Sequence, residues 1–268
     1  MPSSGVFVLL PILNEADCIQ ELLDRIEGVL AGRDYLVGIL DDGSTDGTLE
    51  IVETWMEAHP GRGHLIRGRK PGPGCYRGAA LNRLMRWGLA HTRHDIFVEM
   101  DGDLSHLPEE MPPGLRLIEE GHDVVIASKY LSGSREVHRH ALRRFVSFVN
   151  TGAATWLLNP RISDYSNGFR FYRRSAAELL ARHVPENRGP VYLGEVLAIW
   201  MREGMRVCEF PSTYIGRKTG HSKVIVRDVV RGGLALLRIA FRYHFTGFRR
   251  AGEAPAIDAP PRKHTAGL

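Results

Sequence analysis

The sequence has only three cysteines in 268 residues, and they lie far apart. Cys18, Cys75 and Cys208 form no Cys-x-x-Cys pair, which argues against a structural zinc site and against a disulfide framework. Scattered thiols of this kind fit a reducing compartment. We therefore expect the protein in the cytosol.

Long apolar runs are also missing. No stretch reaches the roughly 18 to 20 apolar residues that a membrane-spanning helix needs. The N-terminus has no basic segment before its short apolar run, so we expect a first strand there instead of a signal peptide. The hydrophobic content of 43% still permits a full core, in one domain of catalytic size with an appendage.

Acidic residues are scarce near the C-terminus. Residues 217–250 hold nine Lys or Arg residues and one acid, Asp228, a local charge of +8, so the rest of the chain carries about −4 of the total +4. This asymmetry points to an anionic surface as partner. We expect no nucleic acid partner, because the basic region contains no recognisable base-reading module.

Within the basic region, apolar residues recur at helical spacing from residue 224 to 248, and Gly232 and Gly233 are expected to kink or break the helix. A basic amphipathic helix can lie at the cytoplasmic face of a membrane, with its apolar side in the lipid. The alternatives are a solvated helix packed on the domain and an oligomer contact. We expect a catalytic domain at 1–215, a basic loop and interface helix at 216–250, and a disordered tail at 251–268.

The first half of the chain alternates strand and helix patterns, which predicts an α/β domain with a mostly parallel sheet. Strands are expected at 6–10, 35–40, 64–67, 95–100 and 123–127, and helices at about 19–30, 48–58, 79–91 and 108–120. Asp46 or Thr48 is expected to cap the second helix. Ligands of such sheets bind beyond the carboxyl ends of the strands.

Polar residues follow several of these strands. Asn14 and Glu15 follow the first, Asp41 and Asp42 the second, and the sequence Asp-Gly-Asp at 101–103 the fourth. Two carboxylates one residue apart, with a glycine between them, suit Mg²⁺ bridged to a diphosphate. Taken alone, the same three residues could form a solvated turn.

The stretch DDGSTDGT, residues 41–48, gives this carboxylate pair a context. A carboxylate after the second strand can accept a hydrogen bond from a ribose hydroxyl or a base edge. The same residues could simply cap the next helix. Further polar motifs follow at 127–130, 163–174 and 216–223.

In this order the motifs resemble those of GT-A glycosyltransferases of family 2, and more closely polyprenyl-phosphate sugar synthases such as dolichyl-phosphate mannose synthase. The resemblance covers residues 6–224. It implies a GT-A fold, which is Rossmann-like, a nucleotide-diphosphate sugar donor, Mg²⁺ or Mn²⁺ as cofactor, and inverting transfer to a polyprenyl phosphate at a peripheral membrane surface.

The resemblance also implies site residues. Pro11, Asn14, Glu15, Asp42 and Asp46 match nucleotide-contacting positions; Asp101, Gly102 and Asp103 match the metal-binding motif, with Ser105 as a further polar ligand. Gly102 replaces a commoner alanine, a change expected to matter little. Arg217 and Lys223 match a basic loop that closes over the diphosphate.

On the acceptor side, Lys129 stands where the family has an arginine, so the charge is kept and the bidentate fork is lost. Arg143 and Ser147 match the family's Arg-x-x-x-Ser, one helical turn apart, as a cradle for the acceptor phosphate. The family's Asp-x-Thr-Ser-Gly-Phe-Arg is here residues 164–170, with Ser166 for Thr and Asn167 for Ser.

Two other functions remain open at this stage. A sugar-hydroxyl acceptor, such as a soluble secondary metabolite, would need a base, for which Asp164, Glu195 or a histidine is a candidate. Glu195 could equally be a solvated acid on a core helix, and we expect His106 and His221 to be polar loop residues. The changes at Lys129 and Asn167 would also fit a binding protein that keeps the nucleotide pocket without turnover.

Overall fold

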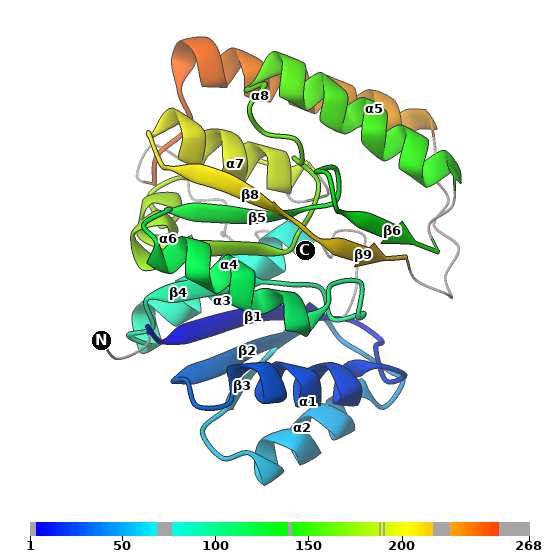
Figure 1. Ribbon diagram of the computed structural model, residues 1–268, viewed down its shortest axis with the longest axis vertical. Helices are drawn as coiled ribbons and strands as arrows, with labels where there is room; N and C mark the ends of the chain where they lie inside the picture. The colour runs from blue at the N-terminus through cyan, green and yellow to red at the C-terminus, as the bar shows by residue number, and fades with distance from the viewer. Residues whose placement is uncertain are drawn as a thin grey trace, which may run out of the picture.

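A central seven-stranded sheet organises the chain (Figure 1). The computed structural model describes residues 4–68, 77–138, 141–187, 189, 191–216 and 226–251. The strand order is β3-β2-β1-β4-β7-β5-β8, and β6 and β9 form a small parallel pair beside it. The strands are β1 Val6–Ile12, β2 Tyr35–Asp41, β3 Gly63–Arg67, β4 Ile96–Glu99, β5 Val124–Ser128, β6 Arg135–Val137, β7 Arg170–Arg173, β8 Val207–Pro211 and β9 Thr213–Ile215.

Helices cover both faces of this sheet. They are α1 Ile19–Leu30, α2 Thr48–Ala58, α3 Arg77–His91, the short 3₁₀ turn η1 Pro108–Glu110, α4 Met111–Glu119, α5 Ala141–Leu157, α6 Arg174–Ala181, α7 Tyr192–Arg202, α8 Val226–Phe241 and the π-helical turn η2 Arg242–Thr246. One apolar core lies under α1, α2 and α4, and a second under α3, α6 and α7. α5 and α8 lie side by side beyond α7 (Figure 1), and Ile239 of α8 joins the second core.

The parallel pairing predicted from the sequence is confirmed for β1 with β2 and β4, β2 with β3, and β5 with β8. β7 is the exception, because it runs antiparallel between β4 and β5. Its first residue, Arg170, pairs with Glu99 near the end of β4 and with Ile126 in β5. The residues before β7 therefore meet the carboxyl ends of the parallel strands at one edge.

The helix and strand positions differ from the sequence-based expectation in two instructive places. The N-cap position of α2 is occupied by Gly47, in a left-handed conformation at φ 93°, and Asp46 accepts from the first helical N–H, that of Thr48, from just outside the helix. Gly232 and Gly233 lie inside an uninterrupted α8, so the expected break is wrong. No helix among the described residues has the length and apolar character to span a bilayer.

Close helix-to-sheet packing predicts a stability difference between two helical glycines. A Cβ at Gly114 of α4 would lie 2.5 Å from the buried Phe171 ring, whereas a Cβ at Gly28 of α1 has nothing within 4 Å. We expect Gly114→Ala to lower the free energy of unfolding by about 1–3 kcal/mol. Gly28→Ala should raise it by roughly 0.5–1 kcal/mol through helix propensity. Urea denaturation measures both, and equal stabilisation by the two changes would contradict the packing.

Candidate active site at the carboxyl edge

The loops after β1 and β2 are held together by hydrogen bonds. Asn14 Oδ1 accepts from the Thr45 N–H at 2.8 Å, and the Asn14 N–H donates to Ser44 Oγ at 2.9 Å. The Glu15 N–H donates to Thr48 Oγ1 at 2.9 Å. Asn14 adopts a positive φ of 54°, a conformation that asparagine tolerates better than most residues. The structure thus brings the predicted Asn14 and Glu15 beside the 41–48 stretch.

The acids of that stretch have different surroundings. Asp46 accepts from Ala16 N–H at 3.2 Å and Thr48 N–H at 3.1 Å; desolvation raises the pKa of Asp46, but these bonds outweigh it and the pKa lies below its usual value. Asp42 is partly buried, and burial together with the neighbouring Asp41 raises its pKa. Asp46 thus links the loop after β1 to the start of α2, whereas Asp42 lies beside a second carboxylate, Asp41.

Asp41, which the sequence analysis did not assign to the site, shapes this loop. Its side chain is buried and accepts from the N–H groups of Gly43 at 2.9 Å and Ser44 at 3.1 Å. Carboxylates followed closely by Gly and Ser form such turns readily. The sequence Asp41-Asp42-Gly43-Ser44 shows this pattern, so the role of Asp41 in the turn could have been predicted from the sequence.

In the 101–106 loop, each carboxylate of the predicted metal-binding pair has a neighbour that orients it. Asp101 forms an ion pair with Arg77 at the start of α3. Asp103 accepts a hydrogen bond from the Ser105 hydroxyl and one from the Ser105 N–H at 3.0 Å. Ser105 is almost fully buried, so here it orients Asp103, and its role as a metal ligand stays a prediction.

Gly102 lets this loop approach the end of β1. A Cβ at Gly102 would lie 2.8 Å from Ile12 Cγ2 and 3.3 Å from the carbonyl oxygen of Pro11. An alanine at this position would require Ile12 to move. Pro11 thus borders the loop through its backbone.

The donor set suits a hard divalent cation that also binds its substrate. Asp101 and Asp103 offer carboxylate oxygens, and Mg²⁺ in proteins commonly takes one or two carboxylates together with phosphate oxygens. The described residues contain no group of three or more His, Cys, Asp or Glu side chains gathered as a metal site. A cation held by this loop would therefore draw its remaining ligands from elsewhere, for example a diphosphate.

Arg77 and His106 are site residues that the sequence analysis missed. Arg77 Nη2 donates to the Gly168 carbonyl at 3.2 Å, and a Cβ at Gly168 would lie 2.2 Å from that nitrogen. His106 lies in the 101–106 loop, as predicted, but it is fully buried and its Nε2 lies 2.8 Å from Asn167 Oδ1. Burial lowers the pKa of His106, which favours the neutral imidazole.

The acceptor-side residues form one polar cluster. Lys129 Nζ donates to Ser166 Oγ at 2.7 Å and lies 3.3 Å from Asp164 Oδ2. The Tyr130 hydroxyl lies 2.9 Å from Ser147 Oγ, which is 3.4 Å from Ser166 Oγ. The structure therefore joins the predicted Lys129, Ser147 and Asp164 through hydroxyl groups of Tyr130 and Ser166.

Asp164 is poorly placed to act as a base. It is fully buried and accepts from the N–H groups of Ser166 at 2.8 Å, Asn167 at 2.9 Å and Lys129 at 3.1 Å. Burial alone raises the pKa of Asp164, but Lys129 and these donors outweigh it, so the pKa lies below its usual value. Asp164 is an ionised anchor for the 164–168 turn.

Two further buried charged side chains hold neighbouring segments: Arg170 holds the turn, and Glu195 holds residues 186 and 187. Arg170 donates to the carbonyl groups of Asn167 at 2.9 Å and Tyr165 at 3.3 Å. Glu195 is buried and accepts from the N–H groups of Glu186 at 3.0 Å and Asn187 at 2.8 Å. Glu195 is thus neither a solvated acid nor free to act as a base.

Some predicted residues cannot be placed. Arg217, Lys223 and His221 lie outside the described residues, and so does the side chain of Arg143. The backbone of Arg143 lies one turn before Ser147 on α5, as the spacing predicted. Their roles stay predictions.

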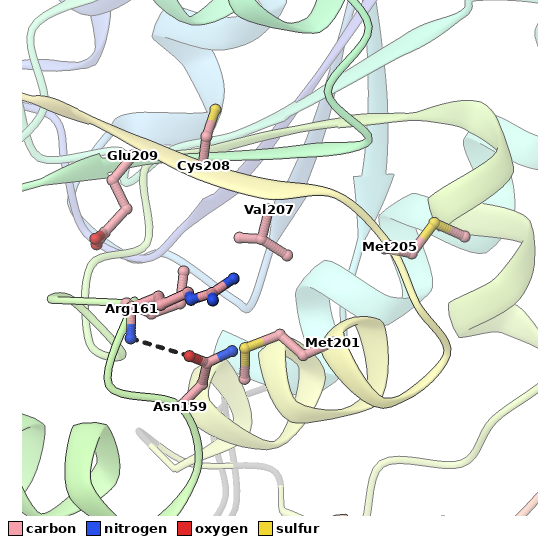
Figure 2. A pocket seen from close by; sticks show the side chains of 8 residues that line it. Asn159, Arg161, Met201, Met205, Val207, Cys208 and Glu209 are labelled. Carbon is pink, nitrogen blue, oxygen red and sulfur yellow. Dashed lines mark hydrogen bonds between the residues drawn. The ribbon is translucent and has the colours of Figure 1, made fainter.

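A separate cavity of about 220 Å³ lies behind the acceptor-side cluster, between β8, the end of α7 and the segment after α5 (Figure 2). Met201, Val207 and Arg161 are among its lining residues. Glu209, also on its wall, accepts from the Ser163 N–H at 2.7 Å and the Asp164 N–H at 2.8 Å. None of the predicted site residues whose side chains the structure describes lines this cavity.

The contact between Arg77 and Gly168 gives a testable prediction. Gly168→Ala places a methyl group where the Arg77 guanidinium now lies, so Arg77 should leave Asp101 and activity should fall about tenfold or more, the usual cost of losing a group that orients a metal ligand. Gly152→Ala on α5, where a Cβ meets nothing within 4 Å, is the matched control. Steady-state kinetics measure both, and wild-type activity in Gly168→Ala would contradict a role for this contact.

Comparison with known proteins agrees with this site. The profile of Glycosyl transferase family 2 matches residues 7–180. The chain is 30% identical over 237 residues to an undecaprenyl-phosphate mannosyltransferase of Micrococcus luteus, covering 86% of this chain and 94% of that protein. It is 32% identical over 227 residues to a polyprenol monophosphomannose synthase of Mycolicibacterium smegmatis, covering 83% and 82%.

A solved structure has the same fold. Glucosyl-3-phosphoglycerate synthase from Mycobacterium tuberculosis, crystallised with Mn²⁺, UDP-glucose and phosphoglyceric acid, superposes with a TM-score of 0.61 over 90% of this chain and 79% of that chain, at 20% identity. Likeness at this level of identity concerns the fold, which is the GT-A glycosyltransferase fold that the motifs predicted. With the profile match spanning more than half of the sequence, the chain belongs to glycosyl transferase family 2.

Proposed function

We propose that this glycosyltransferase moves a hexose, with inversion, from a nucleotide diphosphate sugar to a polyprenyl phosphate. The observation that carries the proposal is the state of the acceptor half. Asp164 is ionised, buried and fully engaged with N–H donors and Lys129, so it is unsuited to take a proton from an attacking hydroxyl. A phosphate monoester is already ionised near neutral pH and needs no such base.

The acceptor-side hydroxyls suit this role. The Ser147 hydroxyl lies within hydrogen-bonding distance of the hydroxyls of Tyr130 and Ser166, and the ammonium group of Lys129 donates to Ser166. O–H and N–H donors around a cation are a common way to orient a phosphate. We propose that this group, with Arg143, receives the acceptor phosphate.

We propose GDP-mannose as the donor, supported by the mannosyltransferase names of the two relatives. Its nucleotide would lie against Asn14, Glu15, Asp42 and Asp46, and Asp101 and Asp103 would hold Mg²⁺ or Mn²⁺ against the diphosphate. When bound, the cation supplies positive charge to the leaving diphosphate. Arg217 and Lys223 would add to that charge.

Purified protein incubated with a panel of nucleotide sugars tests this proposal. Each donor is offered with Mn²⁺ or Mg²⁺, with and without a short polyprenyl phosphate, and release of nucleoside diphosphate is followed. We expect release from GDP-mannose that requires the lipid phosphate. Release that does not depend on the lipid phosphate would reject it as the required acceptor. Donor binding without release under any of these conditions would favour a soluble acceptor or a pocket that no longer catalyses.

Two variants test the proposed metal-binding carboxylates in the same assay. Asp101→Asn and Asp103→Asn keep the side-chain shape and remove one charge each. We expect each to lower turnover by about 100-fold or more, as when one group that stabilises developing charge is lost. Unchanged metal-dependent turnover in both would exclude these carboxylates as the metal site.

We also propose that α5, α8 and η2 form a membrane-binding face. The large apolar side chains that are exposed in the described chain all lie on these elements: Val149, Trp156, Leu234, Leu237, Phe241 and Phe245. Trp156 is 84% exposed and Phe245 is 74% exposed, although both are large aromatics. An apolar patch of this kind on a surface otherwise rich in charge is typical of a binding site for a partner or a membrane.

The charges around this face favour a lipid surface. Arg238 is exposed on α8 between Leu237 and Phe241. Arg242 instead pairs with Glu186 at 2.8 Å, so part of the basic character predicted from the sequence is neutralised within the protein. Exposed aromatics beside an arginine suit the headgroup region of an anionic leaflet. We place this attachment at the cytoplasmic face, where the acceptor phosphate would be met.

Vesicle binding tests the face. Burial of one large aromatic side chain is worth roughly 1.5–3 kcal/mol, so Trp156→Ser and Phe245→Ser should each weaken binding to anionic vesicles about tenfold or more. Arg238→Gln should weaken it chiefly at low salt. Arg116→Gln, on the exposed side of α4 across the sheet, is the matched control. If a protein carrying both Trp156→Ser and Phe245→Ser still sediments with vesicles as wild type does, α5, α8 and η2 do not form the membrane-binding face.

A further inference from the structure

The two halves of the candidate active site are joined by a buried pair of side chains, His106 and Asn167. The Asp101 N–H donates to His106 Nδ1 at 3.1 Å, and His106 Nε2 lies 2.8 Å from Asn167 Oδ1. Asn167 Nδ2 donates to the Ala127 carbonyl. The chain of contacts thus runs from the carboxylate loop to Ala127 near the end of β5, two residues before Lys129.

The proton positions in this chain follow from the partners. A backbone N–H can only donate, so His106 Nδ1 is an acceptor and the ring proton of a neutral imidazole must lie on Nε2. That proton is then donated to Asn167 Oδ1, which leaves the amide nitrogen of Asn167 for the Ala127 carbonyl. Asn167 Oδ1 also accepts from the Phe169 N–H at 3.4 Å, and His106 Nε2 lies 3.8 Å from Asp101 Oδ2. The Ala127 carbonyl can only accept, so the amide of Asn167 must present its nitrogen to it and its oxygen to His106.

The ring has no freedom to turn. His106 is fully buried, stacks on Phe169 with ring centroids 5.2 Å apart, and meets the Tyr214 ring at 5.8 Å. The backbone of Asn167 is also held in place, because its main-chain N–H donates to Asp164 Oδ1 at 2.9 Å. A shift of the Asp101 backbone would therefore be passed to the turn that carries Ser166.

We propose that His106, as the Nε2–H tautomer, and Asn167 couple the carboxylate loop to the acceptor-side turn, so that occupancy of one half changes affinity at the other. Both are positioning residues: they act through Asp101 on one side and through Asp164 and Ser166 on the other. The inference rests on the proposed function, which supplies the two ligands, a nucleoside diphosphate with a divalent cation and a lipid phosphate. The serine that the resembling family has at 167 lacks the amide needed for both contacts.

Linkage between the two ligands tests the coupling in the full-length protein. Titration calorimetry measures the affinity for a short polyprenyl phosphate in detergent, with and without GDP or UDP and Mn²⁺. We expect the nucleotide and Mn²⁺ to tighten lipid phosphate binding at least about fivefold, the lower end of usual site-to-site couplings. In Asn167→Ser and His106→Asn the factor should fall close to one, while each ligand alone binds within about threefold of wild type.

The variants separate coupling from simple structural damage. His106→Asn keeps an acceptor for the Asp101 N–H and loses the contact to Asn167. Asn159→Ser is the matched control for Asn167→Ser, because it makes the same change at an asparagine outside the His106–Asn167 relay. An unchanged coupling factor in both relay variants would overturn the proposal. So would a loss of affinity for each ligand alone that leaves the factor intact, because that pattern indicates a structural role.

Nuclear magnetic resonance provides a readout that needs neither ligand. ¹⁵N-labelled histidine should show His106 as the Nε2–H tautomer, and Asn167→Ser should shift the Asp101 amide resonance whereas Asn159→Ser should not. An Nδ1–H tautomer, or an Asp101 resonance that does not move, would overturn the relay. If wild-type protein binds no lipid phosphate, the proposed function fails, and the resonance data alone then decide the relay.

Discussion

The direction of β7 is the constraint on which the arrangement of this site depends. In a fully parallel sheet, the chain before each strand lies at the amino edge, away from the ligand side. Because β7 runs antiparallel between β4 and β5, the 164–168 turn arrives at the carboxyl edge, next to the loop that carries Asp101 and Asp103. The contacts of Arg77, His106 and Lys129 with that turn all follow from this reversal.

The reversal also concentrates charge in the interior. Glu99, Asp164 and Arg170 are buried at or near this edge, where isolated charges would be costly. Each has specific partners: Tyr172 donates to Glu99 at 3.1 Å, Lys129 and backbone N–H groups surround Asp164, and Arg170 donates to carbonyl groups. Removal of a partner would leave a buried charged group without compensation, so these contacts hold a rigid platform beneath the substrate side of the sheet.

Sequence reasoning succeeded where the signal was local and periodic. The alternation of strands and helices, the parallel pairing and the polar residues at strand ends were all predictable, because each follows from side-chain spacing within one segment. The direction of β7 was not, since a four-residue strand carries no pattern that distinguishes its orientation. The burial of His106 was not predictable either, because its partner Asn167 lies 61 residues away in the sequence.

The exposed aromatics show a further limit of pattern reading. The amphipathic pattern of α8 predicted an apolar face, and Leu234, Leu237 and Phe241 are indeed exposed while Ile239 packs inward. Trp156 of α5 joins that face only because α5 and α8 lie side by side, which no feature of either segment indicates. The surface is a product of tertiary packing.

The 164–168 turn has one property with a bearing on how such enzymes diverge. Its path is fixed mainly through backbone groups, by the Asp164 carboxylate, the Arg170 guanidinium and the Glu209 carboxylate. Tyr165 and Asn167 are buried within the turn, whereas Ser166 is partly exposed. A substitution at 166 can therefore alter the chemistry offered to an acceptor while the scaffold keeps its shape, so new acceptor preferences can arise without a new fold.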